Sequence, residues 1–139
     1  MEVKNKITVS VLLNANLETV WNKFTKPEHI IHWNFASDDW CSPKAENDLR
    51  VGGKFLSRME AKDGSFGFDF EGTYLQVKQM ELIEYILADE RKVKILFEEK
   101  NNQVLLTETF DPENENPIEM QKGGWQAILN NFKKYVELN

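Results

Sequence analysis

The stretch Asn116–Val136, which reads NPIEMQKGGWQAILNNFKKYV, predicts one long C-terminal helix. Its first residues supply an asparagine suited to an N-cap, a proline suited to the first turn and an acidic side chain that complements the helix dipole. Its apolar side chains then recur at helical spacing, at Trp125, Ile128, Leu129, Phe132 and Val136. A helix with one apolar face needs an apolar surface to cover, and the rest of the chain must supply it.

The segment that precedes this helix is typical of a meander of short antiparallel strands. Turn signals divide it at Gly52-Gly53, Asp63-Gly64, Asp89-Glu90-Arg91 and Asn101-Asn102. The pattern between these turns predicts strands over residues 45–51, 54–61, 66–78, 81–88, 92–99 and 103–110. If this sheet curls, a space is left between the sheet and the helix.

The N-terminal part of the chain adds one strand and two helices. Residues 3–13 alternate between apolar and polar side chains, as a half-buried strand does. Asn14 or Asn16 can cap a short amphipathic helix, and Pro27 can start a second one of one or two turns. Residues 34–44 are expected to be irregular. The predicted order is β-α-α-β6-α, an α+β fold in a single domain spanning residues 1–139, with a curved antiparallel sheet wrapped around the C-terminal helix.

Composition and charge argue against several partners. The chain has 17 basic and 23 acidic residues and a net charge of −6, so it repels nucleic-acid phosphates and anionic membranes. No apolar run has the length of a signal peptide or of a membrane span. One cysteine, Cys41, cannot form an internal disulfide. These features predict a cytoplasmic protein that binds neither nucleic acid nor membrane.

Five segments in this order carry a resemblance to a known family. They are Val20-Trp21-x-x-Phe24-Thr-x-Pro27-Glu28-x-Ile30-x-x-Trp33, Gly52-Gly53-x-Phe55, Phe70-Glu-Gly72-x-Tyr74, Phe110-Asp111 and Gly124-Trp125-Gln126-x-Ile128-Leu129-x-Asn131-Phe132. Together they resemble the START-like (SRPBCC) superfamily, and more narrowly the AHSA-like family related to the activator of the heat-shock protein 90 ATPase. The resemblance extends from about residue 7 to residue 137. It implies a helix-grip (START-like or Bet v-like) fold, in a superfamily that includes lipid carriers, hormone receptors, polyketide cyclases and chaperone activators.

Large apolar side chains are expected to face the space between sheet and helix. Two interpretations stay open for them, a close-packed core and a pocket for an apolar small molecule. The residues predicted to contact such a ligand are Trp33, Phe35, Trp40, Met59, Phe68, Phe70, Tyr85, Phe97, Glu108, Trp125 and Ile128. Trp40 could alternatively be a lid over the pocket or an exposed anchor for a protein partner.

Glu108 is the most informative polar position. It shares strand parity with the apolar Val104, Leu106 and Phe110, so its carboxyl group is expected to point inward, where burial would raise its pKa. There it would orient a ligand. The alternative is a carboxylate at the sheet edge, or one turned outward by a bulge.

No residue pattern indicates a catalytic, metal or cofactor site. His29, His32 and Cys41 are too few for a tetrahedral zinc site. Cys41 lacks an activating neighbour, and no nucleophile or phosphate-binding motif occurs. Gly123-Gly124, inside the predicted helix, is either a tolerated irregularity, a point of close approach to the sheet, or a cavity mouth.

The leading hypothesis is therefore a non-enzymatic domain that binds a hydrophobic small molecule between the helix and the sheet. The alternative is a stress-related protein-interaction module, as the AHSA-like resemblance implies, with a protein partner instead of a small molecule. A third hypothesis is a cyclase or hydrolase that uses Glu108 and Tyr85 as acid and base. The sequence leaves a monomer and a homodimer equally open.

Overall fold

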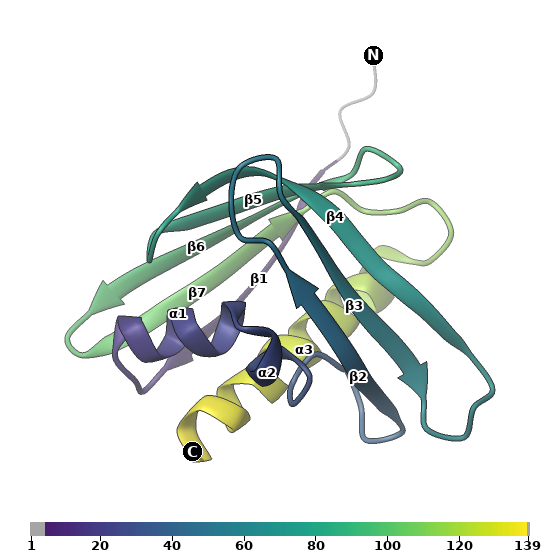
Figure 1. Ribbon diagram of the computed structural model, residues 1–139, viewed down its shortest axis with the longest axis horizontal. Coiled ribbons are helices and arrows are strands. Elements are labelled where there is room, and N and C mark those ends of the chain that lie inside the picture. Colours follow the sequence, from purple (N-terminus) through teal and green to yellow (C-terminus); the bar gives the residue numbers. More distant parts are fainter. Residues whose placement is uncertain (1–4, 139) are drawn as a thin grey trace.

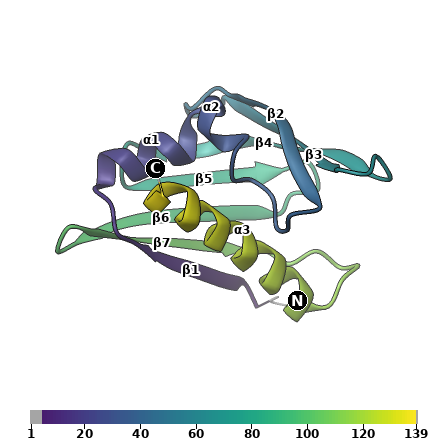
Figure 2. The same ribbon diagram turned by 90° about the horizontal axis from the view of Figure 1, so that it is seen from below.

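Seven antiparallel strands form one curled sheet, and a long helix crosses its concave face in the computed structural model, which describes residues 5–138 (Figures 1 and 2). The sheet order is β1-β7-β6-β5-β4-β3-β2. The elements are β1 (Ile7–Leu13), α1 (Leu17–Thr25), α2 (Pro27–Ile30), β2 (Trp40–Asn47), β3 (Lys54–Ala61), β4 (Gly67–Lys78), β5 (Leu82–Leu87), β6 (Lys92–Lys100), β7 (Gln103–Phe110) and α3 (Ile118–Leu138). This is the predicted helix-grip fold with the predicted element order.

Local sequence signals account for most of the element boundaries. The side chain of Asn16 accepts a hydrogen bond of 2.8 Å from the Thr19 amide and caps α1, while Pro27 takes the first position of α2. Gly64 has a φ of +78° in the β3–β4 turn, a value that glycine adopts without strain. The predicted strand over residues 3–13 is described from Ile7 onward, and its positions 3 and 4 lie outside the described residues.

The position of β2 differs from the prediction. Residues 34–44 were expected to be irregular and residues 45–51 to form a strand, whereas β2 begins at Trp40 and ends at Asn47. β2 is an edge strand that pairs only with β3 among the described strands, and its register shifts between Cys41 and Lys44. Pro43 lies in this shifted segment, where a missing backbone N–H is tolerated. Residues 48–53 therefore form the turn before β3.

The core lies between the concave face of the sheet and the helices. α3 packs most closely against β1, and α1 lies beside the C-terminal half of α3 on the same side of the sheet (Figure 2). The largest fully buried side chains are Leu13, Val20, Leu106, Phe110, Leu129 and Phe132. Phe66, the first residue of the predicted strand 66–78, is 61% exposed, because β4 begins only at Gly67 and Phe66 lies in the preceding turn. Since α3 leans toward β1, the part of the concave face on β3, β4 and β5 is left without close helical cover.

Candidate functional site

A cavity of about 320 Å³ occupies the space between α3 and this part of the sheet. Its volume falls at the lower end of the roughly 300–1,000 Å³ typical of small-molecule sites. Its lining residues are Phe24, Thr25, Ile30, Trp33, Asn34, Glu46, Asn47, Phe55, Ser57, Met59, Phe68, Phe70, Tyr74, Ile83, Tyr85, Arg91, Ile95, Glu108, Trp125 and Ile128. Glu46 and Phe68 line the cavity and are also exposed, so they mark its rim.

Aromatic contacts fix the walls of the cavity. On the helix side, the Trp125 indole stacks on Phe110 with ring centroids 3.9 Å apart, so its position follows from β7. On the sheet side, Phe55 packs edge-to-face on Tyr85 at 4.6 Å, and Phe70 contacts both Tyr85 and Trp125. Because each ring is held by another ring, the walls are preorganised for an apolar occupant.

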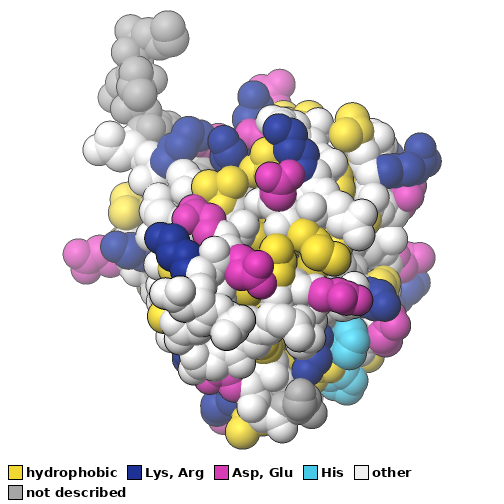
Figure 3. Space-filling view, turned by 90° about the vertical axis from the view of Figure 1, so that its left-hand side faces the viewer, with side chains coloured by type: hydrophobic (Ala, Val, Ile, Leu, Met, Phe, Trp, Pro, Cys, Tyr) yellow, Lys and Arg dark blue, Asp and Glu magenta, His cyan; other side chains and the backbone are white. Residues whose placement is uncertain are grey.

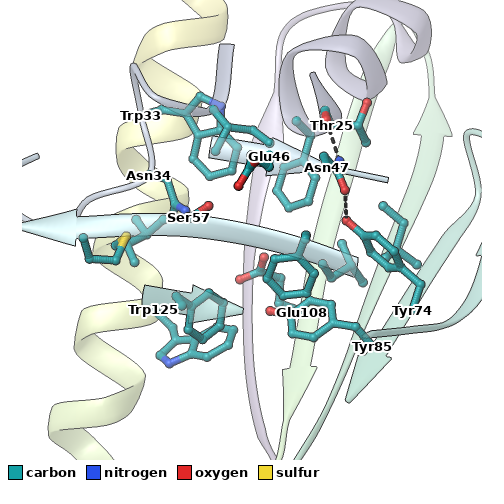
Figure 4. A pocket seen from close by; sticks show the side chains of 18 of the residues that line it. Thr25, Trp33, Asn34, Glu46, Asn47, Ser57, Tyr74, Tyr85, Glu108 and Trp125 are labelled. Atoms are coloured by element: carbon teal, nitrogen blue, oxygen red, sulfur yellow. Dashed lines mark hydrogen bonds between the residues drawn. The ribbon is translucent and has the colours of Figure 1, made fainter. Parts of the chain in front are cut away.

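A chain of hydrogen bonds closes one end of the cavity. The Tyr74 hydroxyl donates to Asn47 Oδ1 at 2.5 Å, and Asn47 Nδ2 donates to the Thr25 carbonyl oxygen at 2.6 Å (Figure 4). Burial raises the pKa of Tyr74, so its hydroxyl stays protonated and remains a donor. The polar groups at this end are thus engaged with one another.

Glu108 points into the cavity with its carboxyl group (Figure 4). It lies in β7 between Val9 of β1 and Ile95 of β6, so the alternative of a carboxylate at the sheet edge is wrong. Only 7% of the residue is exposed, and no residue between 5 and 138 forms a hydrogen bond with its carboxyl group. Burial raises the pKa of Glu108 to about 8, because the apolar surroundings disfavour the charged form. At neutral pH the group is therefore mostly protonated and can donate a hydrogen bond.

Tyr85 extends toward Glu108 from β5, which β6 separates from β7 (Figure 4). It belongs to β5, is 7% exposed, and its hydroxyl forms no hydrogen bond within the described part of the chain. Burial, together with the nearby carboxyl of Glu108, raises its pKa well above the ordinary value. Glu108 and Tyr85 are thus two titratable groups, both buried at the cavity, that the described part of the protein does not engage in a hydrogen bond.

The structure brings most of the predicted contact residues to the cavity wall and places three elsewhere. Lining residues from that prediction are Trp33, Met59, Phe68, Phe70, Tyr85, Glu108, Trp125 and Ile128. Phe97 is instead in the core, where Trp21 and Phe24 cover it at 5.0 and 5.5 Å. Phe35 lines a separate surface hollow against α3. Trp40 packs against Phe66 and Phe68, beside the rim of the cavity and outside its lining.

Several lining residues were absent from the sequence prediction. Ser57 shares strand parity with Phe55 and Met59, so its inward direction could have been read from the sequence. Asn47 lies within the predicted strand 45–51, but it is the last residue of β2, and its contact with Tyr74 depends on tertiary pairing that local sequence does not show. Tyr74 shares strand parity with Phe68 and Phe70, but its bond to Asn47 depends on the pairing of β2 with β3 and of β3 with β4.

Comparison with known proteins identifies the family. The family model described as "Activator of Hsp90 ATPase homolog 1-like protein" matches residues 14–137. The chain belongs to this family. No curated protein matches the sequence.

Solved structures of other AHSA1-like and related proteins have the same fold. The AHSA1-like protein from Aeromonas hydrophila is 40% identical, with a TM-score of 0.90 over 96% of this chain and 92% of its own. A protein from Cytophaga hutchinsonii is 52% identical, with a TM-score of 0.84 over 97% of this chain and 94% of its own. A protein from Nitrosomonas europaea, 16% identical, shares the fold with a TM-score of 0.83 over 99% of this chain and 97% of its own.

The histidines of this AHSA1-like chain lie on the surface, where they form one patch (Figure 3). The ring Nδ1 of His29 is 2.6 Å from the Tyr135 hydroxyl, and the ring of His32 stacks on Tyr135. Within residues 5–138, no group of three or more His, Cys, Asp or Glu side chains could hold a metal ion. No helix in that range is long and apolar enough to cross a membrane.

Gly123 and Gly124 face open space in α3. A Cβ atom added at either residue would meet no heavy atom within 4 Å. The interpretation that their missing side chains allow a close approach to the sheet is therefore wrong. Neither residue is among those that line the cavity.

Proposed function

We propose that this AHSA1-like protein binds an apolar small molecule in the cavity between α3 and the sheet and releases it unchanged. The observation that carries the proposal is the buried, unengaged carboxyl of Glu108 inside an aromatic cavity of about 320 Å³. An interior that served only for packing would be filled, because protein cores have the density of organic crystals. A buried polar group without a partner is also costly, so an occupant that engages it accounts for both features.

Native mass spectrometry of the purified protein is the first test. An adduct that remains under native conditions and disappears on denaturation supports the proposal and gives the mass of the ligand. Binding in solution is then measured with N-phenyl-1-naphthylamine, an uncharged dye whose fluorescence rises in apolar surroundings. Saturable binding at one site per chain is expected.

A matched pair of variants locates the dye. Ile128→Trp adds bulk at a residue that lines the cavity, whereas Ile118→Trp makes the same change at a residue of α3 that is 51% exposed. The first variant should weaken dye binding at least tenfold and the second should leave it within about twofold. Absence of dye binding in the unmodified protein, or equal binding by both variants, would contradict cavity binding.

Protein binding is a second candidate, favoured by a different observation. Trp40, Phe66 and Phe68 form an aromatic cluster, within which Phe66 and Phe68 are 61% and 42% exposed. Exposed aromatic residues are enriched at binding hot spots. The family is named after an activator of the Hsp90 ATPase, so a bacterial or eukaryotic Hsp90 is the partner to test first. Stimulation of its ATPase rate that Phe66→Ser abolishes would support this candidate, and an unchanged rate would count against it.

A further inference from the structure

Besides Asn34, Ser57 and the charged Glu46 and Arg91, the polar groups at the cavity fall into two sets. Asn47, Tyr74 and the Thr25 carbonyl satisfy one another at one end. The Glu108 carboxyl and the Tyr85 hydroxyl point into the cavity without a hydrogen-bond partner among residues 5–138. Buried polar groups are almost always hydrogen-bonded, so the second set marks where an occupant makes its polar contact.

The surroundings of Glu108 contain no cation that would keep it ionised. Val9 and Ile95 flank it on the neighbouring strands, and α3 faces the cavity with the uncharged Trp125 and Ile128. Tyr85 is the titratable group that faces it from β5. An isolated carboxylate in such a place is strongly disfavoured, and the group is held as a neutral acid.

Two further charged side chains line the cavity, and both are engaged elsewhere. Arg91 follows β5, and its Nε atom lies 2.7 Å from Asp89 Oδ2. Glu46 on β2 is at the exposed rim, where its carboxylate lies 3.8 Å from Lys44 Nζ. The charge of Arg91 opposes the rise in the pKa of Tyr85, whereas no cation acts on the pKa of Glu108. The inner end is therefore suited to an uncharged group.

We infer that Glu108 and Tyr85 together donate hydrogen bonds to one acceptor oxygen of an uncharged ligand, a ketone or aldehyde carbonyl attached to an apolar body. This inference rests on the proposed function and names the ligand class for that site. A neutral carboxyl group and a phenol each have one O–H to donate, and a carbonyl oxygen has two lone pairs to accept them. A ligand carboxylate would instead add a buried charge with no cation beside it. A hydrocarbon would leave both donors without partners.

Three probes of nearly equal size separate these classes. 2-Acetylnaphthalene has the carbonyl, 2-isopropylnaphthalene replaces it with a methyl-bearing carbon, and 2-naphthoate replaces it with a carboxylate. Each probe is titrated against bound N-phenyl-1-naphthylamine at pH 6.5. The ketone should displace the dye at a concentration at least tenfold lower than either of the other probes.

Variants at the two donors then test the assignment. Glu108→Leu and Tyr85→Phe should each reduce the ketone's advantage over 2-isopropylnaphthalene to threefold or less. Displacement by 2-isopropylnaphthalene should be unchanged or improved in both variants, which shows that their cavity is intact. Glu108→Gln retains an N–H donor and should therefore keep most of the preference for the ketone.

The pH dependence provides a readout that a purely structural role of Glu108 would not produce. Burial raises the pKa of Glu108 to about 8, so above that pH the carboxylate no longer donates and the affinity for the ketone should fall. In Glu108→Gln the affinity should stay constant from pH 6.5 to 9. If the dye does not bind at all, the proposed function fails. If the dye binds but the three probes compete equally, or the naphthoate competes best, the assignment of the donor pair is overturned and cavity binding stands.

Discussion

The Tyr74 hydroxyl donates a 2.5 Å hydrogen bond to Asn47 Oδ1, and this bond joins β4 to the edge strand β2 across one end of the cavity. Asn47 continues the chain to the Thr25 carbonyl oxygen at the end of α1. Backbone pairing connects β2 to β4 only through β3, so these two side-chain bonds join β4 directly to β2 and β2 to the end of α1. This end of the cavity should therefore depend on Tyr74 for its stability.

Tyr74→Phe should lower the free energy of unfolding by about 1–2 kcal/mol, since it leaves the half-buried Asn47 oxygen without its donor. Tyr85→Phe is the matched control. It removes a hydroxyl of similar burial that has no hydrogen-bond partner within residues 5–138, so it should leave stability unchanged or raise it by up to about 1 kcal/mol. Urea denaturation monitored by far-UV circular dichroism measures both. Equal losses in the two variants would contradict the structural role of the Tyr74–Asn47 bond.

Stability should fall as the pH rises from about 5 to about 8. Burial raises the pKa of Glu108 from 4.5 to about 8, so in this window the folded protein holds a proton that the unfolded chain has released. Alkaline conditions therefore favour unfolding, with a contribution of about 1.4 kcal/mol per pH unit from this group. Above pH 8 both states are ionised and the contribution becomes constant.

Glu108→Gln isolates this effect, because other groups, including His29 with its lowered pKa, titrate alike in both proteins. The difference in unfolding free energy between the variant and the unmodified protein should grow in favour of the variant from pH 5 to pH 8. Urea denaturation at pH 5, 6.5 and 8 measures it. A difference that is independent of pH would show that Glu108 ionises normally in the folded state.

Gly123→Ala and Gly124→Ala should each stabilise the protein by roughly 0.5–1 kcal/mol. Both glycines lie inside α3, neither has a positive φ, and an added Cβ meets nothing within 4 Å. Gly64→Ala is the opposing control, because its φ of +78° is strained for alanine and the variant should lose stability. Thermal melting of the three variants checks the prediction. Destabilisation by either helix variant would show that flexibility or space at that point of α3 is required.

Ser42→Ala should raise stability by about 1 kcal/mol. Ser42 is 2% exposed on β2, and its hydroxyl oxygen has no hydrogen-bond partner in the part of the chain that the structure describes. Removing an unsatisfied buried hydroxyl eliminates its desolvation penalty while keeping nearly the same volume. Thr25→Val is the contrasting variant, because the Thr25 hydroxyl donates to the Trp21 carbonyl oxygen at 2.7 Å and its loss should destabilise. A loss of stability in Ser42→Ala would reveal a partner for that hydroxyl.

The positions of several turns, and the face of the sheet to which a strand's side chains point, could be predicted from the sequence because they depend on neighbouring residues. The Asn101-Asn102 turn is confirmed, with positive φ values of 50° and 65°, and β7 spans the predicted residues 103–110. The inward direction of Glu108 followed from its parity with Leu106 and Phe110, and the structure confirms it. In contrast, the position of β2 depends on its shifted pairing with β3, which is distant in sequence. Pro43 also argued against a strand there, because proline is disfavoured within strands.

The cavity wall also shows the difference between what local sequence determines and what tertiary packing determines. Phe97 and Ile95 both lie on the concave face of β6, yet Ile95 lines the cavity and Phe97 is covered by Trp21 and Phe24. Strand periodicity assigns a side chain to a face. It contains no information about which helix will cover which part of that face, since this depends on the path of α1 and α3 across the sheet.

The sequence by itself therefore determined the element types, their order, the helix-grip fold and, in strands such as β7 whose bounds it predicted, the face on which a side chain lies. These features follow from local periodicity, turn chemistry and the segments that carry the family resemblance. Only the tertiary structure decided that α3 leans toward β1, that a cavity of about 320 Å³ remains over β3, β4 and β5, and that Asn47, Tyr74, Glu108 and Tyr85 line it. These features are set by packing between elements that are distant in sequence. The burial of the Glu108 carboxyl group, and the pKa that results from it, depend on all of the surfaces that surround it.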